Sequence, residues 1–183
     1  PEGGGGSDAA LGAAVAALHA DRGGTYGWPS DYAFAHVAIP NAAAPDWPSF
    51  WAERRLRPAS PDLPAPLAAR VERLADALPD RLPHAPPAAL LHGDLWSGNV
   101  HRAAGRVWLI DPACFRGDPE VDLAMLTLFG RPDPDFDAAY GPLEPGWRER
   151  RPIYQLWPAL NHLRLFGAGY RGMVERLLHE AGA

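Results

Sequence analysis

Two nearby segments carry polar side chains of the types that bind metal ions and move protons. The segment LLHGDLWSGNV holds His92, Asp94 and Asn99, and the segment VWLIDPA ends its apolar run at Asp111. Carboxylate and amide oxygens are the hard donors that Mg²⁺ prefers, and Mg²⁺ takes only one or two protein carboxylates beside the phosphates of a nucleotide. One asparagine and one aspartate would therefore suffice for a magnesium site, next to a second aspartate that can accept a proton.

The spacing of these residues matches a loop that transfers phosphoryl groups. Asn99 follows Asp94 by five positions, so residues 92–99 read H-G-D-L-x-x-x-N. In the catalytic loop of kinases the Asp of this pattern accepts or orients the hydroxyl of the acceptor, and the Asn binds magnesium. Because Asp, Ser, Gly and Asn are also ordinary turn residues, the pattern alone is equally compatible with a purely structural loop.

A predicted hairpin brings the two candidate metal ligands together. The chain between Asn99 and Asp111 reads as two short strands around an Ala-Ala-Gly turn, and strands joined in this way pair antiparallel. Asn99 and Asp111 then lie at the same open end of the hairpin. This geometry favours a phosphotransferase, with residues 90–100 as the catalytic loop and residues 107–113 as the metal-binding segment.

Helices are predicted on both sides of this hairpin, from apolar residues at helical spacing and from capping residues. Residues 21–47 carry Gly, Pro and aromatic residues without a period, and a structureless loop of this length is more often functional than decorative. The sequence thus predicts an α+β fold that is mostly helical, with one short β-hairpin. The predicted helices cover residues 8–20, 47–56 and 64–78, with two more in the last third that separate near 167–169, where Pro152 marks a start and Pro158 a kink.

Asp122 lies in a further predicted helix and has two interpretations. In GDPEVDLAMLTLFG, Asp118 would be the N-cap, Pro119 the first helical residue and Gly130 the residue past the end. Asp122 would then stabilise the helix dipole from the first turn. Alternatively, it turns back and holds the catalytic loop, by accepting backbone N–H bonds or the proton of His92. The second interpretation is favoured.

Composition restricts the class of protein. At 183 residues, with 47% hydrophobic and 21% charged residues, the chain has the composition of an ordinary globular domain. A net charge of −5 argues against nucleic acid as a partner. No apolar run approaches the roughly 18 residues of a membrane span, and no signal peptide is expected at the start. The single cysteine, Cys114, fits a cytoplasmic protein, and the seven histidines lack the spacing of a zinc site.

The sequence contains no lysine, and all 17 basic residues are arginine. Kinases hold the nucleotide phosphates with a lysine on a strand of a small N-terminal lobe, with a helix glutamate and a covering loop. None of these parts is found. We therefore expect residues 8–183 to be the large C-terminal lobe of a protein-kinase-like fold whose N-terminal lobe is absent. Residues 1–7, in PEGGGGSD, are predicted to be a flexible linker or hinge remnant.

Five segments together resemble the fructosamine and ketosamine kinases, a branch of the aminoglycoside phosphotransferase and choline kinase superfamily. They are ALHADRGGTYGWPSD, DWPSFWAERRLRP, HGDLWSGN, DPACFRGDPEVDLAMLTLFG and YQLWPALNHLRLFGAGY. The resemblance runs from about residue 9 to residue 178. Asp31 is kept, but Tyr32 and Ala35 replace the usual Asn and Gly of this stretch, and Asn41 replaces a Gln.

The resemblance implies ATP-dependent phosphorylation of a sugar hydroxyl on a ketosamine, a sugar joined to an amine by glycation, after which the adduct falls off. By the same resemblance, Asp94 is the base or orienting group. Asn99 and Asp111 bind Mg²⁺ and thereby the nucleotide, and His92 and Asp122 support the loop.

Trp96, Trp28 and Asp31 are weaker candidates for the wall of the substrate pocket, because a buried tryptophan with a bonded indole N–H is the commoner structural role. Two other functions stay open. One is a kinase of another small molecule, with an aminoglycoside-like or choline-like acceptor. The other is a kinase-like module that binds without catalysis, which would not need all of Asp94, Asn99 and Asp111. The chain alone is expected to be incomplete and inactive.

Overall fold

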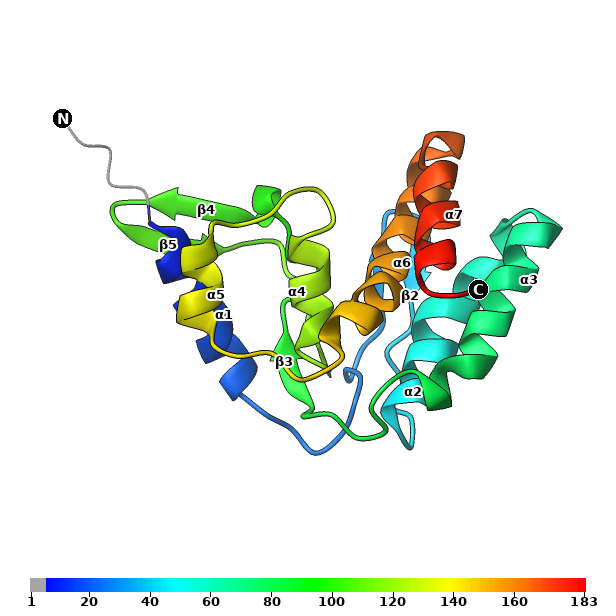
Figure 1. Ribbon diagram of the computed structural model, residues 1–183, viewed down its shortest axis with the longest axis horizontal. Coiled ribbons are helices and arrows are strands. Elements are labelled where there is room, and N and C mark those ends of the chain that lie inside the picture. Colours follow the sequence, from blue (N-terminus) through cyan, green and yellow to red (C-terminus); the bar gives the residue numbers. More distant parts are fainter. Residues whose placement is uncertain (1–5) are drawn as a thin grey trace. The chain divides into compact units, whose positions relative to one another are not determined.

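The chain passes from one structural unit to a second and then returns to each once more (Figure 1). The computed structural model describes residues 6–183. Within them, residues 6–24 and 87–147 form unit 1, and residues 25–86 and 148–183 form unit 2. Residues 90–100 and 107–113, the predicted catalytic loop and the predicted metal-binding segment, both belong to unit 1.

The first helix, α1 (Asp8–Ala20), begins where the sequence predicts it. Ser7 is its N-cap, and the Ser7 side chain accepts a hydrogen bond from the backbone N–H of Ala10 at 3.1 Å. Of the linker predicted over residues 1–7, residues 1–5 lie outside the described residues. Gly6 is buried and Ser7 caps the helix, so these two residues belong to the folded part of the chain.

Two small antiparallel sheets lie in unit 1. One pairs β3 with β6, and the other pairs β4 with β5. The β4–β5 pair is the predicted hairpin, and its two turn residues, Ala104 and Gly105, have φ values of 49° and 72°, as a tight type I′ turn requires. Besides α1, unit 1 contains β3 (Ala89–Leu91), β4 (Val100–Ala103), β5 (Arg106–Leu109), β6 (Phe115–Gly117), α4 (Glu120–Leu126) and α5 (Pro134–Tyr140).

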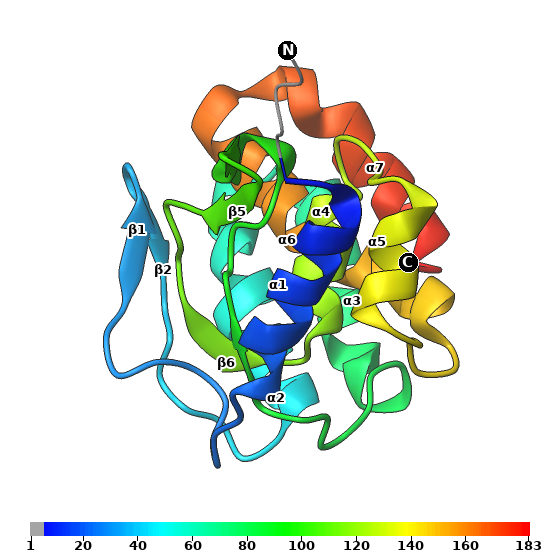
Figure 2. The same cartoon turned by 90° about the vertical axis from the view of Figure 1, so that its left-hand side faces the viewer.

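Helices α1 and α5 lie side by side in unit 1 (Figure 2). They approach closely because Gly12 has no side chain: a Cβ there would stand 2.5 Å from the carbonyl oxygen of Phe136. The inner face of the hairpin packs on the same core through Val100, Val107 and Leu109. The buried residues of this core are Leu11, Val15, Leu95, Leu126 and Phe136.

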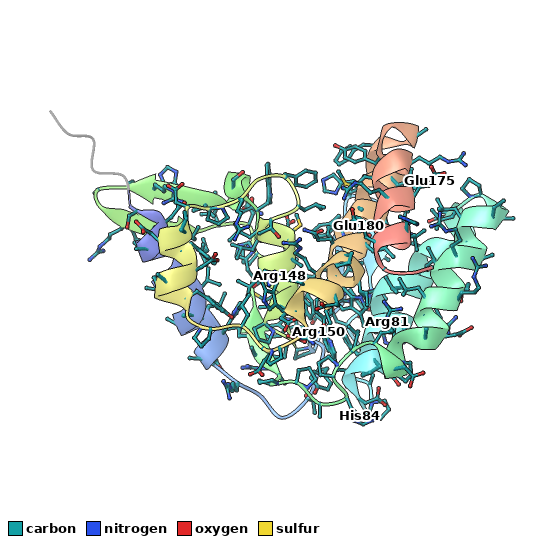
Figure 3. The ribbon with its side chains drawn as sticks, viewed as in Figure 1. Arg81, His84, Arg148, Arg150, Glu175 and Glu180 are labelled. Carbon is teal, nitrogen blue, oxygen red and sulfur yellow. The ribbon has the colours of Figure 1, made fainter. Side chains whose placement is uncertain are left out.

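Unit 2 is built around long helices and an aromatic core. Arg81, which follows α3 and is labelled in Figure 3, donates a hydrogen bond at 2.8 Å to the carbonyl of Ala181, the residue after α7. This bond links the ends of the two helices. The elements of unit 2 are β1 (Tyr32–Phe34), β2 (Val37–Ile39), α2 (Trp47–Trp51) continued by a π-helical turn (Ala52–Leu56), α3 (Ala65–Ala77), α6 (Trp147–Phe166) and α7 (Arg171–Glu180).

A buried arginine lies within the aromatic core of unit 2. The guanidinium carbon of Arg55 is 4.8 Å from the ring centroids of both Phe50 and Trp157, a cation–π arrangement. Burial lowers the pKa of Arg55 to about 9. Its Nη1 donates to the carbonyl of Pro40 at 2.6 Å and its Nη2 to Oδ1 of Asn41 at 2.7 Å. These bonds compensate for part of the cost of burying the charge.

Two predictions about strands and helix ends are wrong. The described residues contain three two-stranded sheets rather than one hairpin, and β1 pairs with β2 inside the segment predicted to be structureless. Helix α4 starts at Glu120, whose N–H donates to Oδ1 of Asp118 at 3.0 Å, and it ends at Leu126, short of Gly130. Past Leu126, the hydroxyl of Thr127 donates to the carbonyls of Leu123 and Ala124, two of the acceptors in the last turn of the helix.

The prediction that Pro152 starts a helix is also wrong, because α6 begins at Trp147 and contains both Pro152 and Pro158. Every residue from 152 to 161 is buried, so burial outweighs the lost backbone bonds. The predicted break after α6 is confirmed at Gly167, which has a φ of 83°. None of the helices in residues 6–183 combines the length and apolar character needed to cross a membrane.

Candidate active site

Asp122 holds the start of the predicted catalytic loop. Its side chain is fully buried, and its Oδ2 and Oδ1 accept the backbone N–H groups of His92 at 2.7 Å and Gly93 at 2.9 Å. This contact is the one that the favoured interpretation of Asp122 requires. Hydrogen bonds to a buried charged group are stronger than neutral ones, so α4 holds the loop firmly.

His92 links the loop to the predicted metal-binding segment. Its Nε2 lies 2.9 Å from the carbonyl oxygen of Ile110, and the backbone N–H of Asp94 donates to its Nδ1 at 3.3 Å. The ring therefore carries its proton on Nε2 and donates it to Ile110 rather than to Asp122, the partner that one version of the sequence interpretation names. The backbone adds a second link, from the N–H of Ala113 to the carbonyl of His92 at 2.9 Å.

Asn99 is oriented by Asp94, the aspartate five residues before it in the predicted motif. Its Nδ2 donates to the carbonyl oxygen of Asp94 at 2.8 Å and to Oδ2 of Asp94 at 3.1 Å. Because Nδ2 is used in this way, Oδ1 is the atom that can coordinate a cation. The backbone N–H of Ile110 donates to the carbonyl of Asn99 at 3.0 Å. Asp111 is the next residue after Ile110, so this bond brings the backbone of Asp111 near Asn99.

Asp111, the predicted second metal ligand, has an uncommon backbone conformation. Its side chain is exposed, and its backbone has a φ of 53°, a left-handed conformation that is uncommon outside glycine and often found at functional sites. An amide oxygen from Asn99 and a carboxylate from Asp111 fit the donor set of Mg²⁺. Among residues 6–183, no cluster of three or more His, Cys, Asp or Glu side chains could hold a metal. A magnesium ion held by Asn99 and Asp111 would complete its coordination with water or with oxygens of the nucleotide.

Two residues of the site were not predicted from the sequence. His19 of α1 contacts Oδ2 of Asp122 through Nε2 at 3.1 Å, and its Nδ1 lies 2.9 Å from the hydroxyl of Tyr140 of α5. A signal for His19 does exist, because it continues the buried stripe of Leu11 and Val15 at four-residue spacing. A histidine in such a stripe needs buried polar partners.

The three candidate residues for the substrate pocket have different surroundings. Trp96 is 39% exposed, and its ring covers Gly98 so closely that a Cβ there would stand 2.3 Å from it. Trp28 and Asp31 belong to unit 2. Asp31 accepts the backbone N–H of Asn41 at 2.7 Å, so it has a structural partner within its own segment. A role for these residues in binding substrate stays a prediction.

Replacing Gly93 by Ala should destabilise the loop. Gly93 has a φ of 80°, and a Cβ would stand 2.1 Å from the carbonyl oxygen of Ala113. Left-handed strain and the clash together should lower the free energy of unfolding by about 1–3 kcal/mol, measured by urea denaturation. Gly130→Ala is the matched control, because nothing lies within 4 Å of its added Cβ. Equal urea midpoints for the two variants would contradict this expectation.

Comparison with solved structures first defines the class of fold. A choline/ethanolamine kinase family protein from Mesorhizobium loti superposes with a TM-score of 0.56 at 20% identity, over 96% of this chain and 60% of that one. The fold is therefore kinase-like. A family model described as Fructosamine kinase matches residues 2–182. The chain belongs to the fructosamine kinase family, which confirms the resemblance seen in the sequence.

Individual relatives agree with this assignment. A "probable ketoamine kinase" from Synechocystis is 38% identical over 93% of this chain and 60% of its own length. A second one, from Lactiplantibacillus plantarum, is 39% identical over 94% and 66%. The crystal structure of a "putative fructosamine-3-kinase" from Thermobifida fusca has a TM-score of 0.89 at 36% identity, over 99% of this chain and 66% of that one. The chain thus spans about three-fifths to two-thirds of these proteins.

Proposed function

We propose that the protein is an ATP-dependent phosphotransferase, or the larger part of one, that phosphorylates a sugar hydroxyl of ketosamines. The observation that carries the proposal is the bonding of Asn99 to Asp94 on one side and to Ile110 on the other. These bonds connect Asp94, the proposed base, to the proposed metal-binding segment. Kinase chemistry needs the base and the metal ligands to be close together in this way. Family membership supports the ketosamine as substrate.

Each residue has a stated role in this proposal. Asp94, which is half-buried, accepts or orients the hydroxyl of the sugar. Asn99 and Asp111 would hold Mg²⁺, which supplies positive charge to the phosphates of ATP when bound. His92 and Asp122 keep the loop in place through the hydrogen bonds described above.

We also propose that sequence outside the 183 residues supplies a nucleotide-covering lobe. No lysine is present to position the phosphates, and correct positioning alone can account for about 7–11 kcal/mol of a reaction barrier. The outer side of the β4–β5 hairpin and its end expose two large apolar residues, Trp108 at 51% and Ile110 at 41%. Exposed apolar groups of this size are suitable for a contact with such a lobe. A cytoplasmic location, without a nucleic-acid or membrane partner, completes the proposal.

The decisive test compares the 183-residue chain with a chain extended by its upstream coding sequence. Both are incubated with ATP, Mg²⁺ and a glycated amino acid such as fructosyl-lysine, and phosphate transfer is followed by mass spectrometry. We expect the extended chain to form phosphorylated product and the 183-residue chain to form little or none. Full activity of the 183-residue chain would contradict the proposed incompleteness.

A panel of acceptors separates the alternatives. The extended chain is offered ketosamines, choline and an aminoglycoside at equal concentrations. Preference for choline or the aminoglycoside would replace the ketosamine in the proposal but keep the reaction type. Transfer to no acceptor, together with measurable binding of one of them, would instead indicate a kinase-like binding module.

A further inference from the structure

Asp122 makes more contacts than the catalytic loop alone requires. Its Oδ2 accepts the N–H of His92 and also contacts Nε2 of His19, while its Oδ1 accepts the N–H of Gly93. An ionised carboxylate only accepts hydrogen bonds, so Nε2 of His19 must carry a proton. The contact is buried, with the His19 side chain 5% and the Asp122 side chain 1% exposed.

The second nitrogen of His19 has its own partner. The hydroxyl of Tyr140 lies 2.9 Å from Nδ1, and the two rings meet edge to face at 5.7 Å. With the Nε2 proton committed to Asp122, a histidine with one proton can only accept at Nδ1, and the Tyr140 hydroxyl donates. Burial, and then the charge of Asp122, raise the pKa of Tyr140, which keeps this donor protonated.

Tyr140 is itself held in a defined position. Its ring stacks on Phe136, with centroids 5.9 Å apart and planes at 7°. Phe136 is buried in the core shared with α1, and α5 packs directly on α1. The hydroxyl therefore points at His19 from a rigid support rather than from a mobile side chain.

We propose that Tyr140 is a positioning residue for the catalytic loop. Its hydroxyl holds the ring of His19 in place through Nδ1, and His19 orients Asp122 through Nε2. Asp122 in turn holds the backbone of His92 and Gly93, directly before Asp94. The chain of contacts runs from α5 through α1 and α4 to the loop. This role for Tyr140 rests on the proposed phosphotransferase function only in its effect on catalysis, since the contacts themselves are independent of the reaction.

Tyr140→Phe tests the proposal because it removes one hydroxyl and keeps the ring. In the 183-residue chain, we expect the amides of His92 and Gly93 to exchange with solvent about fivefold faster, the size expected from one lost hydrogen bond. Nitrogen NMR should show a shifted Nδ1 resonance of His19 in the variant, because that nitrogen loses its hydrogen-bond donor, while Nε2 keeps the proton that it donates to Asp122. In the active extended chain, kcat should fall about fivefold while the KM for ATP is unchanged.

Tyr26→Phe is the matched control, because it also removes a tyrosine hydroxyl, one that donates to the carbonyl of Pro86 at 2.8 Å in unit 2. It should leave the exchange of His92 and Gly93 at the parent rate. A rescue pair adds a second check. His19→Gln, which can still donate to Asp122, should keep most of the protection of these amides, and His19→Leu should lose it.

Parent-like exchange of His92 and Gly93 in Tyr140→Phe would overturn the proposal, and so would equal losses in His19→Gln and His19→Leu. A lower kcat without faster exchange would also overturn it, since the effect would not then pass through Asp122. These outcomes differ from failure of the proposed function. An extended parent chain that transfers no phosphate would refute the phosphotransferase, and the exchange data would still decide the role of Tyr140.

Discussion

Asp94→Asn should lower the kcat of the active extended chain by about 10²–10⁴-fold, the usual contribution of a positioned acid–base group. The amide keeps the shape of the side chain but cannot take up the proton of the sugar hydroxyl. Nucleotide affinity should be nearly unchanged, because Asn99 remains bonded to the backbone carbonyl of Asp94 at 2.8 Å when the side-chain bond is altered. The candidate metal ligands, Asn99 and Asp111, are therefore expected to keep their places.

Steady-state kinetics and a separate titration with Mg²⁺ and ATP distinguish the two effects. Asp80→Asn is the control, since Asp80 is an exposed aspartate in unit 2. It corrects for the loss of one negative charge. A kcat equal to that of the parent enzyme would mean that Asp94 does not face the acceptor hydroxyl. A loss of nucleotide affinity as large as the loss of kcat would place Asp94 among the metal ligands instead.

The parts of the site that the sequence predicted well depend on neighbouring residues. The β4–β5 hairpin forms because Ala104 and Gly105 adopt the left-handed turn between two short strands. The start of α1 follows from Ser7, whose side chain needs a partner only three residues away. Local chemistry of this kind is visible in any short window of sequence.

The parts that were missed depend on residues far apart in the chain. His19 and Tyr140 are 121 positions apart, and His19 and Asp122 are 103 apart. No spacing rule links them. The four-residue stripe in α1 indicates that His19 is buried, but it does not identify Asp122 and Tyr140 as its partners. The same reason applies to β3 and β6, three-residue strands whose pairing of Leu90 with Arg116 depends on burial of the surrounding unit. The spacing of Asp94 and Asn99 alone left a structural loop possible, and the resemblance to a family supplied the predicted roles of these residues.

Asp122→Asn should destabilise the protein and also slow catalysis. The buried carboxylate serves the N–H groups of His92 and Gly93 and the Nε2–H of His19. An asparagine offers only one acceptor oxygen, and its NH₂ group would face a donor. Since each unsatisfied buried donor costs about 1–3 kcal/mol, the free energy of unfolding should fall by about 2–4 kcal/mol.

Urea denaturation measures this loss, and amide exchange locates it. Asp137→Asn is the matched control, because Asp137 is an exposed partner of Arg131 at 3.2 Å in the same unit, and exposed ion pairs contribute about 0–1 kcal/mol. Faster exchange at His92 and Gly93 in Asp122→Asn, with the hairpin amides of β4 and β5 little changed, would place the defect at the loop. If Asp122→Asn were as stable as Asp137→Asn, the buried carboxylate would not be what holds the loop. The positioning role of Tyr140, which acts through Asp122, would then be contradicted as well.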